Sequence, residues 1–175
     1  INNIVENGTI VLNADDNYFN FFKFKSNKKK IKIVSFGIKN KSNICLIKID
    51  KGITNSMIYI NYNKKTLKFL ISNILKNYIY NILSTLAVIS VYFDLEKLDK
   101  SFFNEFHFPE GRGDISLLKF KKRKIYFIDE SYNSNPLSLQ FALNKLDNLN
   151  TKSKRKIVLL GDMLELGKFS KKLHM

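Results

Sequence analysis

The sequence has few of the residues that build disulfide frameworks, metal centres and membrane spans. It contains one cysteine, Cys45, so an intrachain disulfide and a multi-cysteine metal site are both excluded. No stretch approaches the roughly 18 consecutive apolar residues that a transmembrane helix needs. Because Cys45 lies among apolar neighbours, we interpret it as a packed thiol rather than a nucleophile, and we expect a cytoplasmic protein.

Arginine and acidic residues are also scarce. Lysine and arginine total 30 against 15 aspartates and glutamates, a formal charge of +15, yet only Arg112, Arg123 and Arg155 are arginines. A basic face for nucleic acid or anionic lipid is one interpretation. Proteins that recognise nucleic acids rely on bidentate arginine, however, and Lys, Asn and Ile share A/T-rich codons. We therefore favour codon bias, expect no specific nucleic-acid partner, and expect a weak attraction of anionic substrates.

A third absence concerns phosphate binding. The sequence has no Gly-x-x-x-x-Gly-Lys-[Ser/Thr] loop, whose backbone amides and lysine would hold the phosphates of ATP. Its 45% hydrophobic and 13% aromatic residues are nevertheless typical of a globular chain that can bury a sizeable core. The length of 175 residues suits one large or two small domains.

The first part of the chain predicts alternating strands and helices. Short apolar runs predict strands over residues 9–12, 31–36, 44–49, 56–62 and 66–72. Apolar side chains at three- and four-residue spacing predict helices over residues 17–25, 77–93 and 95–104. Asp94 is the expected N-cap of the last helix, and residues 63–65 suit a hairpin turn between two strands.

A linker at residues 106–111 leads to a second region, and we place the domain boundary after residue 108. In this region strands are expected over residues 115–120, 124–128 and 156–160, and helices over residues 136–149 and from about residue 169. The strand over residues 124–128 is expected to be buried. It and the strand over residues 156–160 both end in loops that carry acids. Because open α/β sheets bind nucleotides at the carboxyl ends of their strands, these loops predict one ligand-binding edge.

The turn Asp129-Glu130-Ser131-Tyr132-Asn133-Ser134-Asn135-Pro136 is the most informative segment. It places acids, hydroxyls and amides between a strand and a helix that holds a proline in its first turn. Glu130 can accept both hydroxyls of a ribose or stabilise the helix N-terminus. Asn133 and Asn135 suit turn formation as well as ligand contact. Ser131 and Ser134 are candidate caps for the helix.

Two glycine-flanked segments add candidates. Arg112 lies between two glycines that let the backbone approach a ligand, and its guanidinium suits a phosphate; a surface arginine in a linker is the alternative. Asp162 and Glu165 lie on the loop of residues 161–167, where they can bind an amine or stabilise the first turn of a helix. We interpret His107, in Phe-His-Phe, as a packing residue of the linker.

Four motifs together resemble the Mur ligase family. The turn over residues 129–136 and the run Leu160-Gly161-Asp162-Met163-Leu164-Glu165-Leu166-Gly167 are similar to segments of its C-terminal domain. Asn13-Ala14-Asp15-Asp16 is similar to the end of a strand in its central domain, and Gly111-Arg112-Gly113 to the junction of the two domains. Sister ligases and folylpolyglutamate synthase carry a different turn. The resemblance is therefore to the branch that adds D-alanyl-D-alanine to the UDP-N-acetylmuramoyl tripeptide.

The resemblance implies an α/β fold. Residues 1–108 would be the C-terminal part of a central ATPase domain, and residues 109–175 the first part of a Rossmann-like C-terminal domain. The family places its phosphate loop, a modified lysine and the Mg²⁺ ligands before the point where this sequence begins, and its C-terminal domain continues further. We therefore expect an internal fragment, inactive alone, of a cytoplasmic ligase that is monomeric and has no membrane span.

The implied activity belongs to peptidoglycan synthesis, and thus to cell-wall biogenesis, cell shape and cell division. In the family, ATP with Mg²⁺ phosphorylates the tripeptide carboxylate, and the amine of D-alanyl-D-alanine attacks the acyl phosphate. The resemblance assigns the ATP ribose to Glu130 and other nucleotide contacts to Arg112, Asn133 and Asn135. It places Asp162 and Glu165 on the substrate side of the cleft. It puts no catalytic residue or metal ligand in this sequence, and domain closure at residues 109–113 would assemble the site.

Asn81 is the last nucleotide candidate. It ends a family pattern of Gly, a basic residue, His, Asn, two variable residues and Asn, of which this sequence keeps Lys76 and Asn81. The resemblance implies adenine contact by Asn81. Asn77, at the position of the histidine, either replaces it as a hydrogen-bond partner or caps the helix. His174 matches a histidine of the family.

Three alternatives stay open. A folylpolyglutamate synthase-like ligase would carry a different turn at residues 129–136. A non-catalytic Mur-like domain would keep the fold without the activity. A basic nucleic-acid-binding domain would bind DNA or RNA with a steep dependence on salt.

Overall fold

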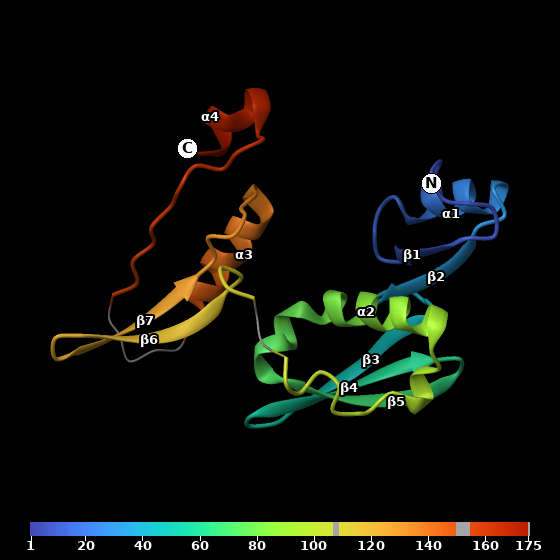
Figure 1. The fold of residues 1–175 in the computed structure, drawn as a ribbon, viewed down its shortest axis with the longest axis horizontal. Helices are drawn as coiled ribbons and strands as arrows, with labels where there is room; N and C mark the ends of the chain where they lie inside the picture. The colour runs from blue at the N-terminus through green and yellow to red at the C-terminus, as the bar shows by residue number, and fades with distance from the viewer. Residues whose placement is uncertain (107–108, 150–154, 175) are drawn as a thin grey trace. The chain divides into compact units, whose positions relative to one another are not determined.

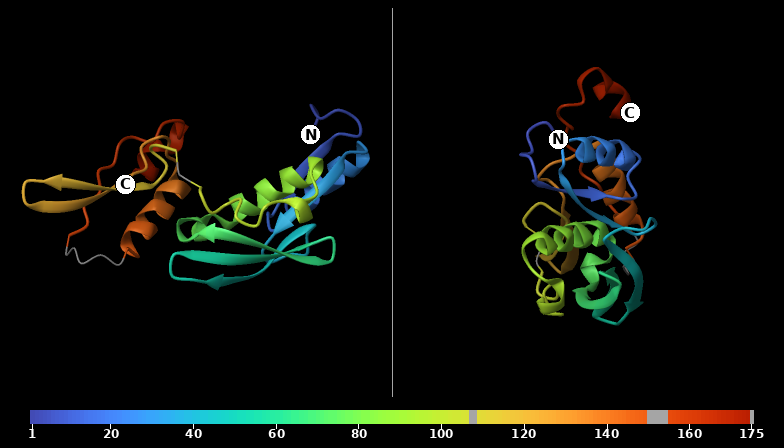
Figure 2. Two further views of the ribbon diagram at one scale, coloured as in Figure 1. Left: turned by 60° about the horizontal axis from the view of Figure 1, so that its bottom comes forward. Right: turned by 90° about the vertical axis from the view of Figure 1, so that its right-hand side faces the viewer.

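In the computed structural model, the structure describes residues 1–106, 109–149 and 155–174. The chain divides into two compact units, Ile1–Phe106 and His107–Met175, here called unit 1 and unit 2. Both combine strands with helices, which confirms the predicted α/β class (Figure 1, Figure 2). The proposed packing of His107 lies outside the described residues.

Unit 1 is built on a mixed sheet of five strands in the order β1-β2-β3-β4-β5. The strands are β1 (Thr9–Asn13), β2 (Lys32–Gly37), β3 (Ile44–Lys51), β4 (Asn55–Tyr62) and β5 (Lys65–Ser72). β1 and β2 are parallel, β2 and β3 are parallel over two residue pairs, and β3, β4 and β5 form an antiparallel meander. All five predicted strands are confirmed. The predicted turn between β4 and β5 is also present, with Asn63 and Lys64 both at positive φ.

Two helices pack on this sheet (Figure 1). α1 (Phe19–Lys28) connects β1 to β2 and contacts both. α2 (Ile79–Tyr92) follows the 3-10 helix η1 (Asn73–Tyr78) and contacts β1, β2 and β3. Since side chains alternate between the two faces of a strand, the buried residues of β4 (Ser56, Ile58 and Ile60) and of β5 (Phe69 and Ile71) lie at every second position. The largest fully buried apolar side chains are those of Ile44, Ile58, Ile60, Phe69, Ile71, Leu83, Leu86 and Leu95.

The segment Asn73–Tyr92 is long and apolar enough to cross a membrane, judged by length and composition alone. No other segment of the described residues meets this criterion. Within the segment, α2 buries five side chains and contacts three strands of the sheet. We therefore interpret it as the core helix of unit 1.

The helix predicted over residues 95–104 is wrong. Asp94 caps a helix as expected, but that helix is the single turn η2 (Leu95–Lys97). Asp99 then accepts hydrogen bonds from the backbone N–H and the hydroxyl of Ser101, a local arrangement that competes with helix. The following chain runs along β5 instead: the Leu70 N–H donates to the Lys100 carbonyl, and Phe103 forms a bridge with Ile71.

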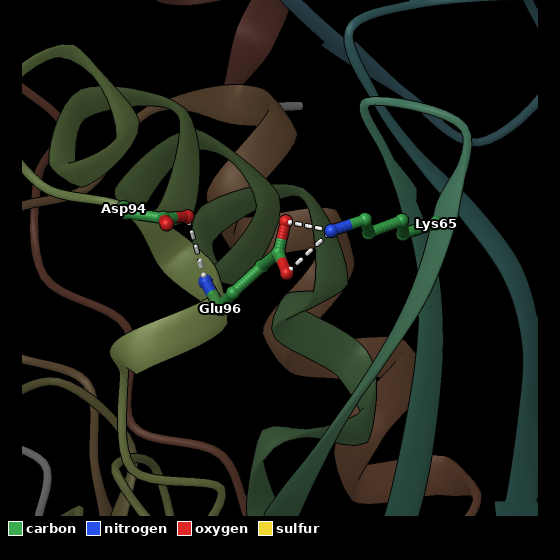
Figure 3. A network of polar contacts seen from close by, with 3 residues as sticks. All are labelled: Lys65, Asp94 and Glu96. Atoms are coloured by element: carbon green, nitrogen blue, oxygen red, sulfur yellow. Dashed lines mark hydrogen bonds and ion pairs between the residues drawn. The ribbon is translucent and has the colours of Figure 1, made fainter.

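Polar contacts link η2 to β5 (Figure 3). The Asp94 carboxylate accepts a hydrogen bond from the Glu96 N–H at 3.1 Å. Lys65 Nζ, on β5, donates to both carboxylate oxygens of Glu96 at 2.9 and 2.8 Å. The hydrogen bond to Glu96 raises the pKa of Lys65. The ion pair of this network is exposed to solvent, so the network is not part of the core.

Unit 2 contains an antiparallel hairpin of β6 (Asp114–Phe120) and β7 (Arg123–Asp129). α3 (Pro136–Asp147) follows, and the described residues end with η3 (Gly167–Phe169) and α4 (Ser170–Leu173). The strands and helices predicted for this region are confirmed except for the strand over residues 156–160. The helix expected from about residue 169 is present as α4, with four residues.

Two expectations for unit 2 are wrong. Residues 124–128 form a strand, but most of its side chains are exposed, and the Phe127 side chain is 44% exposed. Residues 156–160 form no strand, and Leu159 is 91% exposed. An apolar run becomes a strand only when a neighbour completes its hydrogen-bond ladder, and in the described chain β7 pairs with β6 alone. The predicted ligand-binding edge shared by two adjacent strands is therefore absent from the described residues.

Candidate functional site

Two segments of unit 2 are joined by backbone hydrogen bonds, and the binding candidates Arg112 and Glu130 lie on them. The Gly113 N–H donates to the Asp129 carbonyl at 2.6 Å, and the Tyr132 N–H donates to the Gly111 carbonyl at 3.1 Å. Both glycines have positive φ, 72° for Gly111 and 89° for Gly113. Because L side chains rarely adopt a φ of 89°, the position of Gly113 favours glycine, and a Cβ atom there would also lie 2.5 Å from Glu130 Oε1.

Arg112, between these glycines, stacks on Tyr132. Its guanidinium carbon lies 4.1 Å from the centre of the tyrosine ring. A cation over an aromatic face is held in place, while the planar guanidinium keeps N–H donors at its rim that suit a phosphate or carboxylate. Arg112 itself is exposed. The structure thus orients this candidate by a contact that the sequence analysis missed.

Glu130 lies beside the ammonium group of Lys145, a residue of α3. Lys145 Nζ is 3.5 Å from Glu130 Oε1 and donates a hydrogen bond to the Gly113 carbonyl at 3.0 Å. The Lys145 side chain is 15% exposed and that of Glu130 is 36% exposed. Arg112 and Glu130 are therefore brought together by one cluster that also contains Gly113, Tyr132 and Lys145.

Asp129 has a local role. Its Oδ1 accepts a hydrogen bond from the Ser131 N–H at 2.9 Å. Hydrogen bonds from the hydroxyl and the backbone of Ser131 lower the pKa of the Asp129 carboxyl. The residue therefore closes the turn directly after β7.

The amides of the turn differ in their roles. Asn135 caps α3: its Oδ1 accepts a hydrogen bond from the Ser138 N–H at 2.9 Å, and its own N–H donates to Ser138 Oγ at 2.9 Å. The prediction that Ser131 and Ser134 cap this helix is wrong, because the reciprocal pair of Asn135 and Ser138 occupies the capping position. Asn133 is exposed in the same turn.

Asp162 and Glu165 lie on an exposed loop of unit 2. Glu165 has φ 62°. Between them Met163 is buried, and its N–H donates to His174 Nε2 at 2.9 Å. His174 Nδ1 lies 2.8 Å from the Ser170 carbonyl oxygen. Through these two contacts His174 ties the loop to α4.

Asn81 lies in unit 1, exposed in the first turn of α2. Asn77 does not cap this helix, because it lies within η1 and the N-cap is Tyr78, which makes no capping hydrogen bond through its side chain. The neighbouring Tyr80 hydroxyl donates to Asp15 Oδ2 at 3.0 Å. The first turn of α2 is thus attached to the end of β1 by a side-chain contact.

Asp15 is a residue whose role the sequence analysis missed. Its carboxylate accepts backbone N–H groups of Ile38 at 2.6 Å, Lys39 at 3.1 Å and Asn40 at 2.7 Å, as well as the Tyr80 hydroxyl. Partial burial, the largest single effect, raises the pKa of Asp15, but these hydrogen bonds together lower it below 3.8. The same bond and burial raise the pKa of Tyr80. Asp15 therefore joins β1, the loop after β2 and α2.

A cavity of about 300 Å³ opens at the carboxyl ends of β1 and β2. Its lining includes the rings of Tyr18, Phe19, Phe22 and Phe36 and the polar residues Asn13 and Asp16. For metals, the described residues contain no group of three or more His, Cys, Asp or Glu side chains that could hold an ion.

Comparison with known proteins identifies the family. Residues 1–89 match the Mur ligase middle domain, which is more than half of the chain. The chain therefore belongs to the Mur ligase family. The UDP-N-acetylmuramoyl-tripeptide--D-alanyl-D-alanine ligase of Rickettsia prowazekii is 26% identical to it over 175 residues. That similarity covers 98% of this chain and 37% of the relative, so the chain spans little more than a third of the length of this relative.

Solved structures show the same fold. A MurF structure from Acinetobacter baumannii matches 99% of this chain and 36% of its own length, with a TM-score of 0.75 and 19% identity. The MurF ligase of Thermotoga maritima, solved in complex with ADP, matches 97% of this chain and 36% of its own, with a TM-score of 0.67 and 21% identity.

Proposed function

We propose that this protein is an ATP-dependent ligase of peptidoglycan precursor synthesis that joins D-alanyl-D-alanine to the UDP-N-acetylmuramoyl tripeptide. The observation that carries the proposal is the similarity to the Rickettsia prowazekii ligase of that name, which extends through both units of the chain. The fold likeness to MurF structures, one of them with ADP, supports it. Membership of the Mur ligase family makes a nucleic-acid-binding role the weaker alternative.

We propose that the site in unit 2 binds part of a nucleotide. Glu130 offers a carboxylate, which suits the hydroxyls of a ribose. Arg112, oriented on Tyr132 and flanked by glycines, offers donors for a phosphate. In this proposal Glu130 and Arg112 bind ATP from unit 2, with Asn133 and Asn135 in the same turn, and Asn81 contributes from unit 1. Mg²⁺ would be held by residues outside this sequence, and those residues would share the ATP phosphates with Arg112.

The proposed chemistry has two steps. The tripeptide carboxylate attacks the γ-phosphorus of ATP, which gives an acyl phosphate and ADP. The amine of D-alanyl-D-alanine then attacks the acyl carbon and displaces inorganic phosphate, which forms the amide. Asp162 and Glu165 would attract the ammonium group of the incoming dipeptide, because their loop is exposed and acidic.

The test is an assay of the longest protein that the gene encodes. We would supply ATP, Mg²⁺, the UDP-linked tripeptide and D-alanyl-D-alanine, and measure phosphate release together with the mass of the product. We expect phosphate release to require both the tripeptide and the dipeptide. Diaminopimelate offered with the UDP-linked dipeptide serves as the control for a sister ligase. Product from that pair alone would move the protein to another branch of the family.

A variant tests the nucleotide site separately. Glu130→Ala should raise the KM for ATP, because a ribose contact is lost, and should leave the KM for D-alanyl-D-alanine unchanged. An unchanged KM for ATP would remove Glu130 from the nucleotide site. The 175-residue chain alone should show no ligation.

A further inference from the structure

Lys145 is placed unlike an ordinary surface lysine. It belongs to the last turn of α3, yet its side chain is only 15% exposed. Its ammonium group donates to the Gly113 carbonyl, 32 positions away in the sequence, and lies 3.5 Å from Glu130 Oε1. A desolvated ammonium is costly unless acceptors surround it, and these two oxygens are such acceptors. The three segments that carry Lys145, Gly113 and Glu130 therefore meet at one point.

We infer that Lys145 is a positioning residue that orients the Glu130 carboxylate toward the ribose hydroxyls of the bound nucleotide, and thereby sets the preference for a ribonucleotide. The inference rests on the proposed function. Lys145 acts through Glu130: one carboxylate oxygen, Oε1, lies against the ammonium group, which leaves Oε2 to accept a hydroxyl.

A glutamate carboxylate needs such a positioning partner because its side chain is flexible. A glutamate side chain has one more rotatable bond than aspartate, so its carboxylate samples more positions and loses more entropy when a ligand fixes it. An ammonium group at a fixed point removes that freedom before the ligand binds. The same ammonium group holds the Gly113 carbonyl, so it also fixes the segment that carries Arg112.

The experiment compares three nucleotides in the ligation assay: ATP, 2′-deoxy-ATP and 3′-deoxy-ATP. In the unaltered protein we expect a higher kcat/KM for ATP than for either deoxynucleotide. Lys145→Met should reduce this ratio at least fivefold, mainly through a raised KM for ATP, with kcat changed less. Methionine keeps most of the packing volume of the lysine stem and removes the charge.

A matched control comes from the same unit. Lys156 also lies close to a carboxylate, Asp147 Oδ1, at 3.9 Å, and its side chain is 34% exposed. Lys156→Met should therefore leave the ratio between ATP and the deoxynucleotides unchanged. Lys145→Arg, which keeps the charge on a longer donor, should restore part of the ratio that Lys145→Met loses.

A double variant with Glu130→Gln distinguishes a positioning role of Lys145 from a role in folding. In Glu130→Gln the ratio should already be low, and adding Lys145→Met should lower it no further. A general loss of folded protein would instead lower activity with all three nucleotides equally. If Lys145→Met does not fold, Lys145→Gln, which also removes the charge, decides: a ratio equal to that of the unaltered protein overturns the inference.

The outcomes distinguish this inference from the function on which it rests. No ATP-dependent ligation by the unaltered protein would overturn both. Ligation that does not discriminate between ATP and the deoxynucleotides would overturn the ribose role of Glu130 and, with it, that of Lys145. Normal discrimination that persists in a folded Lys145→Met variant would overturn the inference alone.

Discussion

The two units bury their apolar side chains to different extents. Unit 1 has a continuous core formed by β3, β4, β5 and α2. Among the described residues of unit 2, Met163 is the one large apolar side chain that is buried, and those of β6 and β7 are largely exposed. Unit 1 is thus held by packing, whereas the described part of unit 2 is held by backbone pairing, a helix cap and a polar cluster. The candidate site is held together by these backbone and polar contacts rather than by an apolar core.

The largest effect is expected when one aromatic ring is removed from each unit, which tests the difference in burial between them. Phe69 is 1% exposed and makes an edge-to-face contact with Phe103. Phe69→Ala should lower the free energy of unfolding by about 3–5 kcal/mol, because it leaves a cavity in a packed core. Phe127→Ala, in β7, should cost less than about 1 kcal/mol, since the ring is 44% exposed. Urea titration measures both, and equal costs would contradict the comparison.

A second test compares two aspartates that follow strands. Asp15→Asn, in unit 1, should cost about 1–3 kcal/mol at neutral pH, because charge-assisted bonds from several backbone amides are weakened. Asp129→Asn should cost less, because the hydrogen bonds to Asp129 come from Ser131 alone.

The effect of Asp15 depends on pH in a defined direction. Its pKa is lower in the folded chain than the ordinary 3.8, so the folded state binds this proton more weakly than the unfolded state does. The stabilisation is complete above pH 3.8 and is lost as the pH falls through the folded value. The difference between unaltered protein and Asp15→Asn should therefore shrink in acid, as urea titrations at several pH values can show. A constant difference down to the lowest pH would contradict this.

The third test concerns helix caps. Asn135→Ala should destabilise α3 by about 1 kcal/mol, because the helix loses the acceptor for the Ser138 N–H. Asn77→Ala is the control in unit 1, where α2 begins without a side-chain cap and depends on packing. Hydrogen exchange of the α3 and α2 amides measures the two effects. Faster exchange in α2 than in α3 would reverse the expected order.

The smallest effect is expected for an exposed ion pair. The Lys65 side chain is 62% exposed, against 15% for Lys145, although each contacts a glutamate. Lys65→Met should leave the urea midpoint unchanged within error, because solvent screens the pair with Glu96. Lys145→Met should shift the midpoint, because it leaves Glu130 and the Gly113 carbonyl without their donor. A larger shift for Lys65→Met would show that exposure does not rank these pairs.

The sequence correctly predicted the elements that bury an apolar face. It failed for two segments whose structure depends on local side-chain turns or on a pairing partner. β4 and α2 were predictable because their apolar periodicity matches the core that they form. Residues 95–104 and 156–160 have the composition of a helix and a strand. The first adopts local side-chain turns instead, and the second lacks a pairing partner within the described chain.

The site was predictable to a similar extent. Arg112 and Glu130 were recognisable from their immediate neighbours, because glycines and a strand end surround them. Tyr132 and Lys145 were not, because their roles depend on contacts between separate segments: Lys145 pairs with a residue 15 positions away. One pattern could have indicated Lys145, which is the only basic residue in the predicted helix over residues 136–149.

The topology of the sheet in unit 1 also predicts the order in which its strands pair during folding. β4 pairs on both sides with strands that neighbour it in the sequence, whereas β1 reaches β2 only after the chain has formed α1. Contacts that close short loops form faster than those that close long ones. We therefore expect β3, β4 and β5 to form a template before β1 joins it, so that pulse-labelled amides of β4 gain protection earlier than those of β1. The hydrogen bonds from the backbone of Ile38, Lys39 and Asn40 to Asp15 would then be among the last to form. They would stabilise the sheet only after β1 has paired with β2.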